Sequence, residues 1–337
     1  MKYLFLLFLS LVFFQGCTCN KNRSKIVQLS GEAQGTTYHI VLLTDIKSDF
    51  KPAVDSILKV IDQSLSTYLP TSVISRINNN DSTVIPDDHF INVFNKSKEV
   101  SESTAGVFDI TVAPIINAWG FGFSKKEQVD SVLIENLLQY IGYKKVSIQN
   151  NKLVKENPGI MLDFNAIAQG YAVDVIAAYL NSKGVINYFV ELGGEVIAKG
   201  DKGNHEYWKI GIDKPIEEPV EQREMQAVIK LFNKALATSG NYRKFYVENG
   251  QKFSHIIDPK TGYPAKNNLL SASVIAEDCM TADAYATAFM VMGLEKSLQF
   301  LTENRELNLG VFLIYDDKGS LKTYTSESLK KWVDILF

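Results

Sequence analysis

Thr281-Ala282-Asp283-Ala284-Tyr285-Ala286-Thr287 lies inside an apolar run that predicts a helix over residues 279–292. Positions four apart share one face of a helix, so Asp283 and Thr287 are expected to point the same way. A carboxylate and a hydroxyl are hard oxygen ligands of the kind that Mg²⁺ takes in proteins. A helix cap or an exposed polar pair would show the same spacing, so the choice depends on the rest of the chain.

The first residues have the pattern of an export signal. A positively charged start precedes residues 4–14, which are almost entirely apolar but too short for a permanent membrane span. The small residue Gly16 directly before Cys17 is typical of a bacterial lipobox, and an ordinary secretory signal with a chance cysteine is the alternative. We predict that residues 1–16 are removed, that Cys17 carries a lipid and that residues 17–30 form a tether. The protein is then expected to be a membrane-anchored lipoprotein facing the periplasm or the cell exterior.

Length and charge limit the classes of function that this protein can have. The 337 residues carry 35 Lys and Arg against 38 Asp and Glu, without a basic block, so nucleic acid is not an expected partner. Roughly 310 residues remain after the signal, and we predict one domain over residues 31–337. Three cysteines and four histidines without a Cys/His cluster support neither a disulfide framework nor a structural zinc site. Cys279 is expected to be a buried small hydrophobe.

Hydrophobic periodicity predicts an α+β or mixed α/β architecture in one intertwined unit. Helical spacing of apolar residues predicts helices over residues 52–65, 89–101, 131–141, 167–180, 279–292 and 294–304. Segments rich in β-formers predict strands over residues 36–43, 188–197, 207–212, 227–232, 270–276 and 309–315.

Two segments suit a binding pocket. The apolar stretch 106–114 encloses Asp109 and is followed by the aromatic and glycine residues 119–122, which fits the wall for a flat ring, although a buried strand and a turn would look similar. Asp163 and Asn165 stand just before a helix of small residues. The free N–H groups of a helix N-terminus bind phosphate readily, and simple N-capping by either side chain is the alternative.

Three turn-like segments complete the set. The pair Gly193-Gly194 follows an apolar strand and permits a bulge, a close backbone approach or a plain turn. Residues 238–240 (Thr-Ser-Gly) are expected to expose hydroxyls and N–H groups at a turn. His255 precedes the rigid turn 258–264, which would hold a reactive group in place, although a lone His is more often structural.

The order of these segments resembles the ApbE family, the bacterial FAD:protein FMN transferases. Each motif is weak alone, but the common order of so many is specific. The landmarks run from the first strand to the helix end: residues 35–38, 66–68, 75–78, 108–111, 119–122, 163–174, 193–195, 238–240, 255–259 and 282–287. The resemblance implies an ApbE-like fold in which FAD is bound between two intimately packed lobes.

The resemblance also implies site residues. Mg²⁺ is expected across the FAD diphosphate, with Asp283, Thr287 and the backbone carbonyl of Ala166 as ligands. His255 matches the His proposed to assist catalysis, and Asp258 would orient it or share its role. The positions that correspond to FAD contacts are Gln34, Tyr68, Val107, Phe108, Asp109, Asp163, Gln169, Thr238, Ser239 and Ile257. Gln34 stands where the family often has Met, and Gln169 where it often has Lys.

The implied reaction is Mg²⁺-dependent transfer of FMN from FAD to a Ser or Thr hydroxyl of an exported or membrane flavoprotein, with release of AMP. A histidine such as His255 suits the role of base because the ordinary pKa of imidazole is about 6.5. Two alternatives stay open: a Mg²⁺-dependent FAD pyrophosphatase, in which water replaces the protein hydroxyl, and a non-enzymatic flavin-binding lipoprotein.

Overall fold

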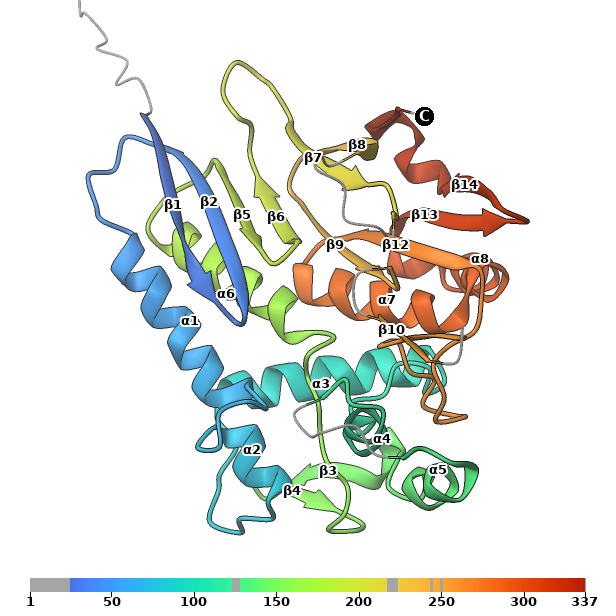
Figure 1. Cartoon of the computed structure of the whole chain (residues 1–337). Coiled ribbons are helices and arrows are strands. Elements are labelled where there is room, and N and C mark those ends of the chain that lie inside the picture. The colour runs from blue at the N-terminus through green and yellow to red at the C-terminus, as the bar shows by residue number, and fades with distance from the viewer. Residues whose placement is uncertain (1–24, 123–127, 217–223, 243–244, 249–250, 337) are drawn as a thin grey trace, which may run out of the picture.

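The computed structural model describes residues 25–122, 128–216, 224–242, 245–248 and 251–336. The predicted signal, Cys17 and the first part of the predicted tether lie outside the described residues. An eight-stranded antiparallel sheet forms the centre of the molecule (Figure 1). Its order is β1 (Lys25–Ala33), β2 (Thr36–Thr44), β5 (Tyr188–Leu192), β6 (Glu195–Lys199), β9 (Lys234–Gly240), β12 (Leu269–Ala276), β13 (Gly310–Asp317) and β14 (Ser320–Thr325).

Helices cover one face of this sheet and a small second sheet covers the other. The helix layer contains α1 (Lys51–Leu65), α6 (Ala168–Ser182), α7 (Cys279–Met292) and α8 (Leu294–Glu303). The second sheet has the order β15 (Val333–Ile335), β8 (Met225–Leu231) and β7 (Trp208–Asp213). Side chains of a strand alternate between faces, and β9 shows this clearly. Its Ala235 and Ala237 join the core under the helices, whereas Leu236 joins the core under the second sheet.

A second lobe lies below the helix layer in Figure 1. It contains α2 (Val73–Asn78), α3 (Asp88–Ser103), α4 (Ala113–Ala118), α5 (Ser131–Leu138) and the hairpin of β3 (Val146–Gln149) and β4 (Lys152–Lys155). The hairpin of β10 (Phe245–Glu248) and β11 (Gln251–Ser254) packs against this lobe, because Phe253 stacks on Trp119 and Tyr246 on Phe121, each with ring centroids 5.3 Å apart. The chain after β9 therefore joins the two lobes.

The predicted α+β architecture is confirmed, and the helix over Cys279–Met292 has the predicted bounds. Cys279 is a free, fully buried thiol, as expected. The segment predicted as one strand over residues 188–197 is two strands, because Gly193 and Gly194 take φ values of +67° and +115° in a turn between them. These glycines form a turn, and Gly193 also makes a close backbone approach, since an added Cβ would lie 2.9 Å from Gln169 and Thr36.

Three other predictions need correction. Residues 25–30 are not tether but part of β1, which pairs with β2 along its whole length and alternates between exposed and half-buried residues from Val27 onward. Residues 238–240 end strand β9 instead of forming a turn. The stretch 106–114 contains no buried strand, since a loop there leads directly into α4.

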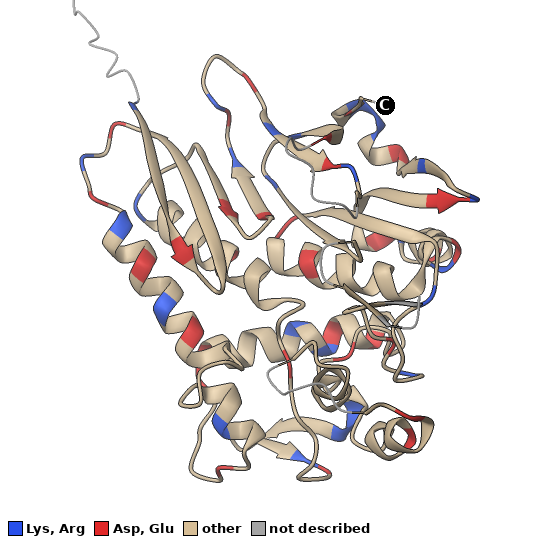
Figure 2. Ribbon diagram, in the orientation of Figure 1, with Lys and Arg blue, Asp and Glu red and all other residues tan. Residues whose placement is uncertain are grey.

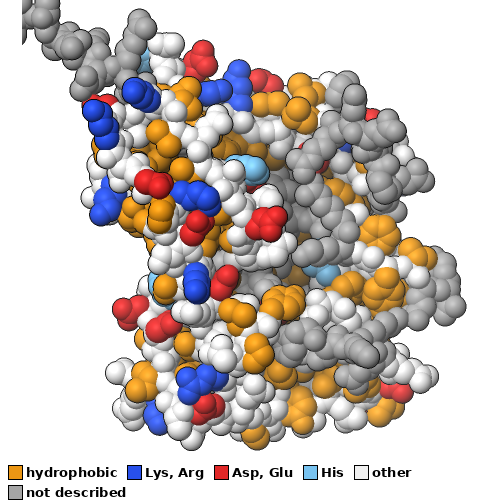
Figure 3. All heavy atoms as spheres, turned by 60° about the vertical axis from the view of Figure 1, so that its left-hand side comes forward, with side chains coloured by type: hydrophobic (Ala, Val, Ile, Leu, Met, Phe, Trp, Pro, Cys, Tyr) orange, Lys and Arg blue, Asp and Glu red, His pale blue; other side chains and the backbone are white. Residues whose placement is uncertain are grey.

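Charges of both signs are interspersed over the molecule. Basic and acidic residues alternate along α1 and occur in both lobes (Figure 2), and the face in Figure 3 also carries both signs. Within the described ranges, no helix combines the length and the apolar character needed to cross a bilayer.

Candidate active site

Helix α7 places Asp283 at the contact with α6 and Thr287 beside strand β9. Asp283 is 5% exposed, and its Oδ2 accepts a hydrogen bond from the Gly170 N–H at 3.1 Å. The Oγ1 of Thr287 lies 3.1 Å from the Oγ of Ser239. The cap of α7 is Asp278, whose Oδ1 accepts the N–H of Thr281. Asp283 is therefore neither a helix cap nor part of an exposed polar pair, and its role as a metal ligand stays a prediction.

Helices α6 and α7 approach each other closely at Gly170. A Cβ atom added there would lie 2.4 Å from the carbonyl oxygen of Cys279 and 2.9 Å from Cβ of Asp283. Burial raises the pKa of the Asp283 carboxyl to about 7, and the hydrogen bond from Gly170 opposes this. Burial disfavours the charged form of a carboxyl group, so a nearby cation would strongly stabilise the Asp283 carboxylate.

The loop before α6 joins the site to the second lobe. Asp163 is 7% exposed, and burial raises its pKa. Its N–H donates to the carbonyl oxygen of Ile110 at 2.8 Å, and its Oδ1 accepts the N–H of Asn165 at 2.7 Å. The residue before α6 is Ile167, which makes no side-chain cap, so neither Asp163 nor Asn165 caps this helix as the simpler interpretation required.

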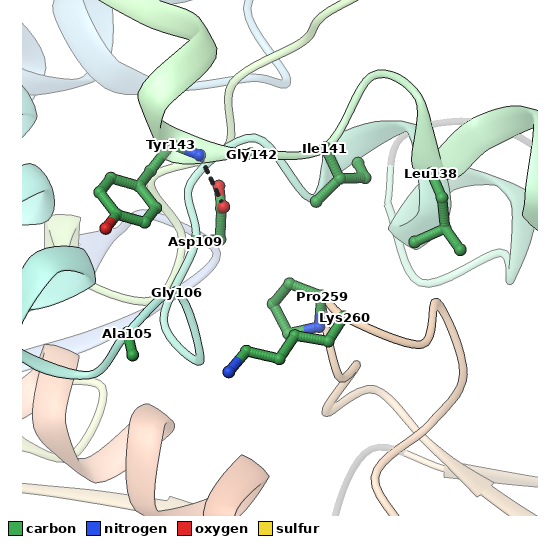
Figure 4. A pocket seen from close by; sticks show the side chains of 9 residues that line it. All are labelled: Ala105, Gly106, Asp109, Leu138, Ile141, Gly142, Tyr143, Pro259 and Lys260. Atoms are coloured by element: carbon green, nitrogen blue, oxygen red, sulfur yellow. Dashed lines mark hydrogen bonds between the residues drawn. The ribbon is translucent and has the colours of Figure 1, made fainter.

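Asp109 lines a pocket of about 390 Å³ (Figure 4). Its carboxylate accepts hydrogen bonds from the N–H and Oγ1 of Thr111 at 2.8 and 2.6 Å and from the N–H of Tyr143 at 2.7 Å. Lys260 extends from the opposite side toward the loop at Gly106. The full lining is Ala105, Gly106, Asp109, Leu138, Ile141, Gly142, Tyr143, Pro259 and Lys260.

The aromatic residues 119–122 are not part of this lining. Trp119 is 5% exposed, and its Nε1–H donates to the carbonyl oxygen of Gly262 at 2.9 Å. The predicted pocket wall therefore consists of the Asp109 loop, and the tryptophan instead anchors the turn that follows His255. Phe108 and Ile257 are 4% and 6% exposed, belong to two different core clusters and are not in this lining, while Val107 is partly exposed.

Two more of the predicted FAD contacts, Tyr68 and Gln34, come from elements outside the pocket lining. Tyr68 is 63% exposed; desolvation and then the negative charge of Asp163 raise its pKa, which places these two side chains near each other. Gln34 has a φ of +53° in the turn between β1 and β2. Burial raises the pKa of Asp62, and a hydrogen bond from Gln34 opposes this. The Oε1 of Gln34 is buried without a hydrogen-bond partner among the described residues, so it is an acceptor that a ligand would satisfy.

Gln169 of α6 points to the sheet and Ser239 of β9 faces the helix layer, but Thr238 does not. A Cβ added to Gly193 would lie 2.9 Å from the Nε2 of Gln169, so this side chain packs against the turn between β5 and β6. Thr238 has the opposite orientation to Ser239, and its Oγ1 lies 2.8 Å from the Oγ of Ser273. Thr238 therefore does not share a face with Ser239, and its predicted contact with the ligand stays a prediction.

His255 follows β11 directly and lies against the second lobe. Its ring is 6.4 Å from that of Phe121 in an edge-on arrangement. Asp258 Oδ1 accepts the N–H of Lys260 at 2.9 Å, and the Asp258 N–H donates to the carbonyl of Tyr263 at 2.9 Å. The Asp258 carboxylate therefore stabilises the turn itself, and its predicted role toward His255 stays a prediction.

The donors at α7 fit a magnesium ion. Asp283 offers a carboxylate, Thr287 a hydroxyl and Ala166, two residues before α6, a backbone carbonyl. Mg²⁺ commonly takes one or two carboxylates and completes its shell with waters and substrate phosphates. Among the described residues no group of three or more His, Cys, Asp or Glu could hold a metal ion, so a site here depends on this mixed set of oxygens.

Sequence reasoning missed two residues that build this site. Gly170 supplies the close approach and the N–H for Asp283, and Asp174 accepts the N–H groups of Cys279 and Met280 at 2.8 Å each. The two residues are four apart on one face of α6. This glycine-to-aspartate spacing within a run of small residues is the signal that would have found them.

Comparisons with known proteins agree with this architecture. The profile of the ApbE family matches residues 34–311. A FAD:protein FMN transferase of Haemophilus influenzae is 36% identical over 327 residues, with 93% of each chain covered. The flavin transferase ApbE from Vibrio cholerae has a TM-score of 0.81 at 34% identity, over 92% of this chain and 99% of its own. The apo flavinyl transferase ApbE from Pseudomonas stutzeri also has a TM-score of 0.81, at 29% identity, over 92% and 97%. The chain therefore belongs to the ApbE family.

Proposed function

We propose that the protein is an FAD:protein FMN transferase, which moves FMN from FAD to a Ser or Thr hydroxyl of a partner protein and releases AMP. The observation that carries this proposal is the contact between α6 and α7, which holds the buried Asp283 carboxylate against Gly170, with the Thr287 hydroxyl of the same helix beside Ser239. Relatives with this function match over nearly the whole chain.

Asp283, Thr287 and the carbonyl oxygen of Ala166 would hold Mg²⁺ in this proposal. When bound, the ion neutralises the diphosphate charge and stabilises the leaving phosphate of AMP. The buried position of Asp283 favours this role, because a carboxylate with a pKa raised to about 7 gains most from a neighbouring cation. One carboxylate and two neutral oxygens would be enough protein ligands for Mg²⁺, because substrate phosphates would supply the remaining ligands.

The chain's own residues would bind FAD and accept the proton. The pocket beside Asp109 would take the flat ring system, Tyr68 lies near Asp163, and the buried Oε1 of Gln34 offers an unpaired acceptor among the described residues. In the reaction the acceptor hydroxyl oxygen forms a bond to the phosphorus on the FMN side. The bond from that phosphorus to the bridging oxygen breaks, and AMP leaves with the electron pair. His255 would take the hydroxyl proton, held at the start of a turn that Trp119 and Asp258 stabilise.

We further propose that the protein acts outside the cytoplasm as a lipoprotein anchored through Cys17. The support is the apolar segment with Gly16-Cys17 at its end, followed by a polar stretch before β1. Acceptors would then be exported proteins or the exposed domains of membrane flavoproteins.

An intact-mass measurement tests the function. The protein is incubated with FAD, Mg²⁺ and an acceptor domain that carries a Ser or Thr flavinylation motif. An acceptor that gains the mass of FMN, with AMP released and both changes lost in EDTA, supports transfer. Free FMN and AMP with an unmodified acceptor would mean that the enzyme is a pyrophosphatase, and unchanged FAD bound to the protein would mean a carrier.

A further inference from the structure

Gly170 and Asp174 both lie on the side of α6 that faces α7, but they make different contacts with it. Gly170 donates its N–H to Asp283, in the second turn of α7. Asp174, one helical turn further along α6, accepts the N–H groups of Cys279 and Met280 through separate oxygens, each at 2.8 Å. Helix α7 is thus held from α6 at its first and second turns.

The first turn of α7 is capped from two places, by Asp278 next to the helix and by Asp174 on α6. An α-helix begins with four N–H groups that have no partner inside the helix. Asp278 accepts the N–H of Thr281 at 2.8 Å through its side chain and the N–H of Ala282 at 3.3 Å through its carbonyl. Asp278 is the residue next to α7, so these bonds stabilise the helix without tying it to any other element. The first four N–H groups belong to residues 278–281; Asp174 accepts two of them, those of Cys279 and Met280, and comes from a different helix.

This difference matters because the predicted metal ligands are divided between the two elements. Ala166 lies two residues before α6, whereas Asp283 and Thr287 belong to α7. The separation between the carbonyl and the carboxylate is therefore set by the position of α7 along α6. Metal sites tolerate only about 0.5 Å of displacement before their geometry fails.

We propose that Asp174 is a positioning residue for the magnesium site, which fixes the register of α7 against α6 so that Asp283 and Ala166 reach one ion. The inference rests on the proposed function only for the identity of the ion and its phosphate ligand. Removal of a group that orients a metal ligand typically weakens metal binding about 10–100-fold.

The test compares Asp174→Ala and Asp174→Asn with Asp278→Ala as the matched control, in the full chain with FAD bound. Mg²⁺ affinity is measured by calorimetric titration, and Tm is measured without metal. We expect Asp174→Ala to weaken Mg²⁺ binding at least about tenfold, and Asp174→Asn, which keeps one acceptor oxygen, to lie between it and the wild type. Asp278→Ala should lower Tm while its Mg²⁺ affinity stays within about twofold of the wild type.

Two results would overturn the proposal. One is an Asp174→Asn protein that folds and binds Mg²⁺ as the wild type does. The other is an equal loss of affinity in the Asp278→Ala control, which would reduce Asp174 to a general stabiliser of α7. Because ion binding is measured without an acceptor, a wild type that binds Mg²⁺ and FAD but fails to modify the acceptor would contradict the transferase function and leave the role of Asp174 supported.

Discussion

Gly170→Ala is the perturbation whose effect the structure defines best. The added methyl group would meet the Cys279 carbonyl oxygen at 2.4 Å and the Asp283 Cβ at 2.9 Å. Both belong to packed helix atoms that cannot rotate away, so α6 and α7 must separate by about 1 Å to reach ordinary contact, as overpacked cores do. That shift would stretch the 3.1 Å hydrogen bond from Gly170 to Asp283.

The costs to stability and to activity are expected to differ greatly. Overpacking costs about 1–3 kcal/mol, but Ala is favoured over Gly inside a helix by about 1 kcal/mol, so the net loss of unfolding free energy is about 0–2 kcal/mol. A displacement of about 1 Å in a catalytic arrangement can cost about 10²-fold in rate. We therefore expect a folded Gly170→Ala protein whose FMN transfer is about 100-fold slower.

The assay pairs urea unfolding with acceptor flavinylation over a range of Mg²⁺ concentrations. Gly319→Ala is the matched control, since Gly319 has a φ of +86° and open space around it in the β13–β14 turn. That variant should lose a similar amount of stability through backbone strain and keep its transfer rate. If Gly170→Ala transfers FMN within about threefold of the wild type, the close approach of α6 and α7 does not set the geometry of the site.

Four further predictions concern the metal ligand, the base, pH and the turn. Asp283→Ala should abolish transfer while circular dichroism shows a folded protein. The fold should survive because the buried Asp283 carboxyl makes no salt bridge among the described residues. Near-normal transfer at millimolar Mg²⁺ would refute the metal role. His255→Ala should slow transfer about 10²–10⁴-fold with FAD still bound in equilibrium dialysis, and loss of FAD would mean a structural role instead. Burial raises the pKa of Asp174 and of Asp283 to about 7, against about 3.9 for an unfolded Asp, so the folded protein holds more protons between about pH 4 and 7. In EDTA its urea midpoint should therefore fall from pH 5 to pH 7.5 on account of these groups, and Asp283→Asn should flatten the slope. Trp119→Phe should lower the free energy of unfolding by about 1–3 kcal/mol, because the Gly262 carbonyl loses its buried donor; an unchanged urea midpoint would contradict this.

Local patterns were enough to predict most elements of the fold. Helix α7 matches its predicted bounds because a mostly apolar run begins directly after the capping residue Asp278, which fixes where the helix starts. Strand β1 does alternate in burial from Val27 to Ala33, but a short apolar and polar alternation directly after a polar stretch does not show which strand it pairs with; the pairing with β2 comes from the tertiary structure. The strand end at residues 238–240 was mistaken for a turn, because Thr-Ser-Gly is common in both settings.

The sequence by itself determined which chemistry the site can hold, through Asp283 and Thr287 on one helix face, and the order of motifs identified the family. Only the tertiary structure decided that Ser239 faces α7 while Thr238 points to the second sheet, and that Gly170 and Asp174 join α6 to α7. The reason is physical: residue spacing within one element sets which side chains share a face, but the distance between elements depends on how their surfaces pack. That packing alone brings residues more than one hundred positions apart into one site.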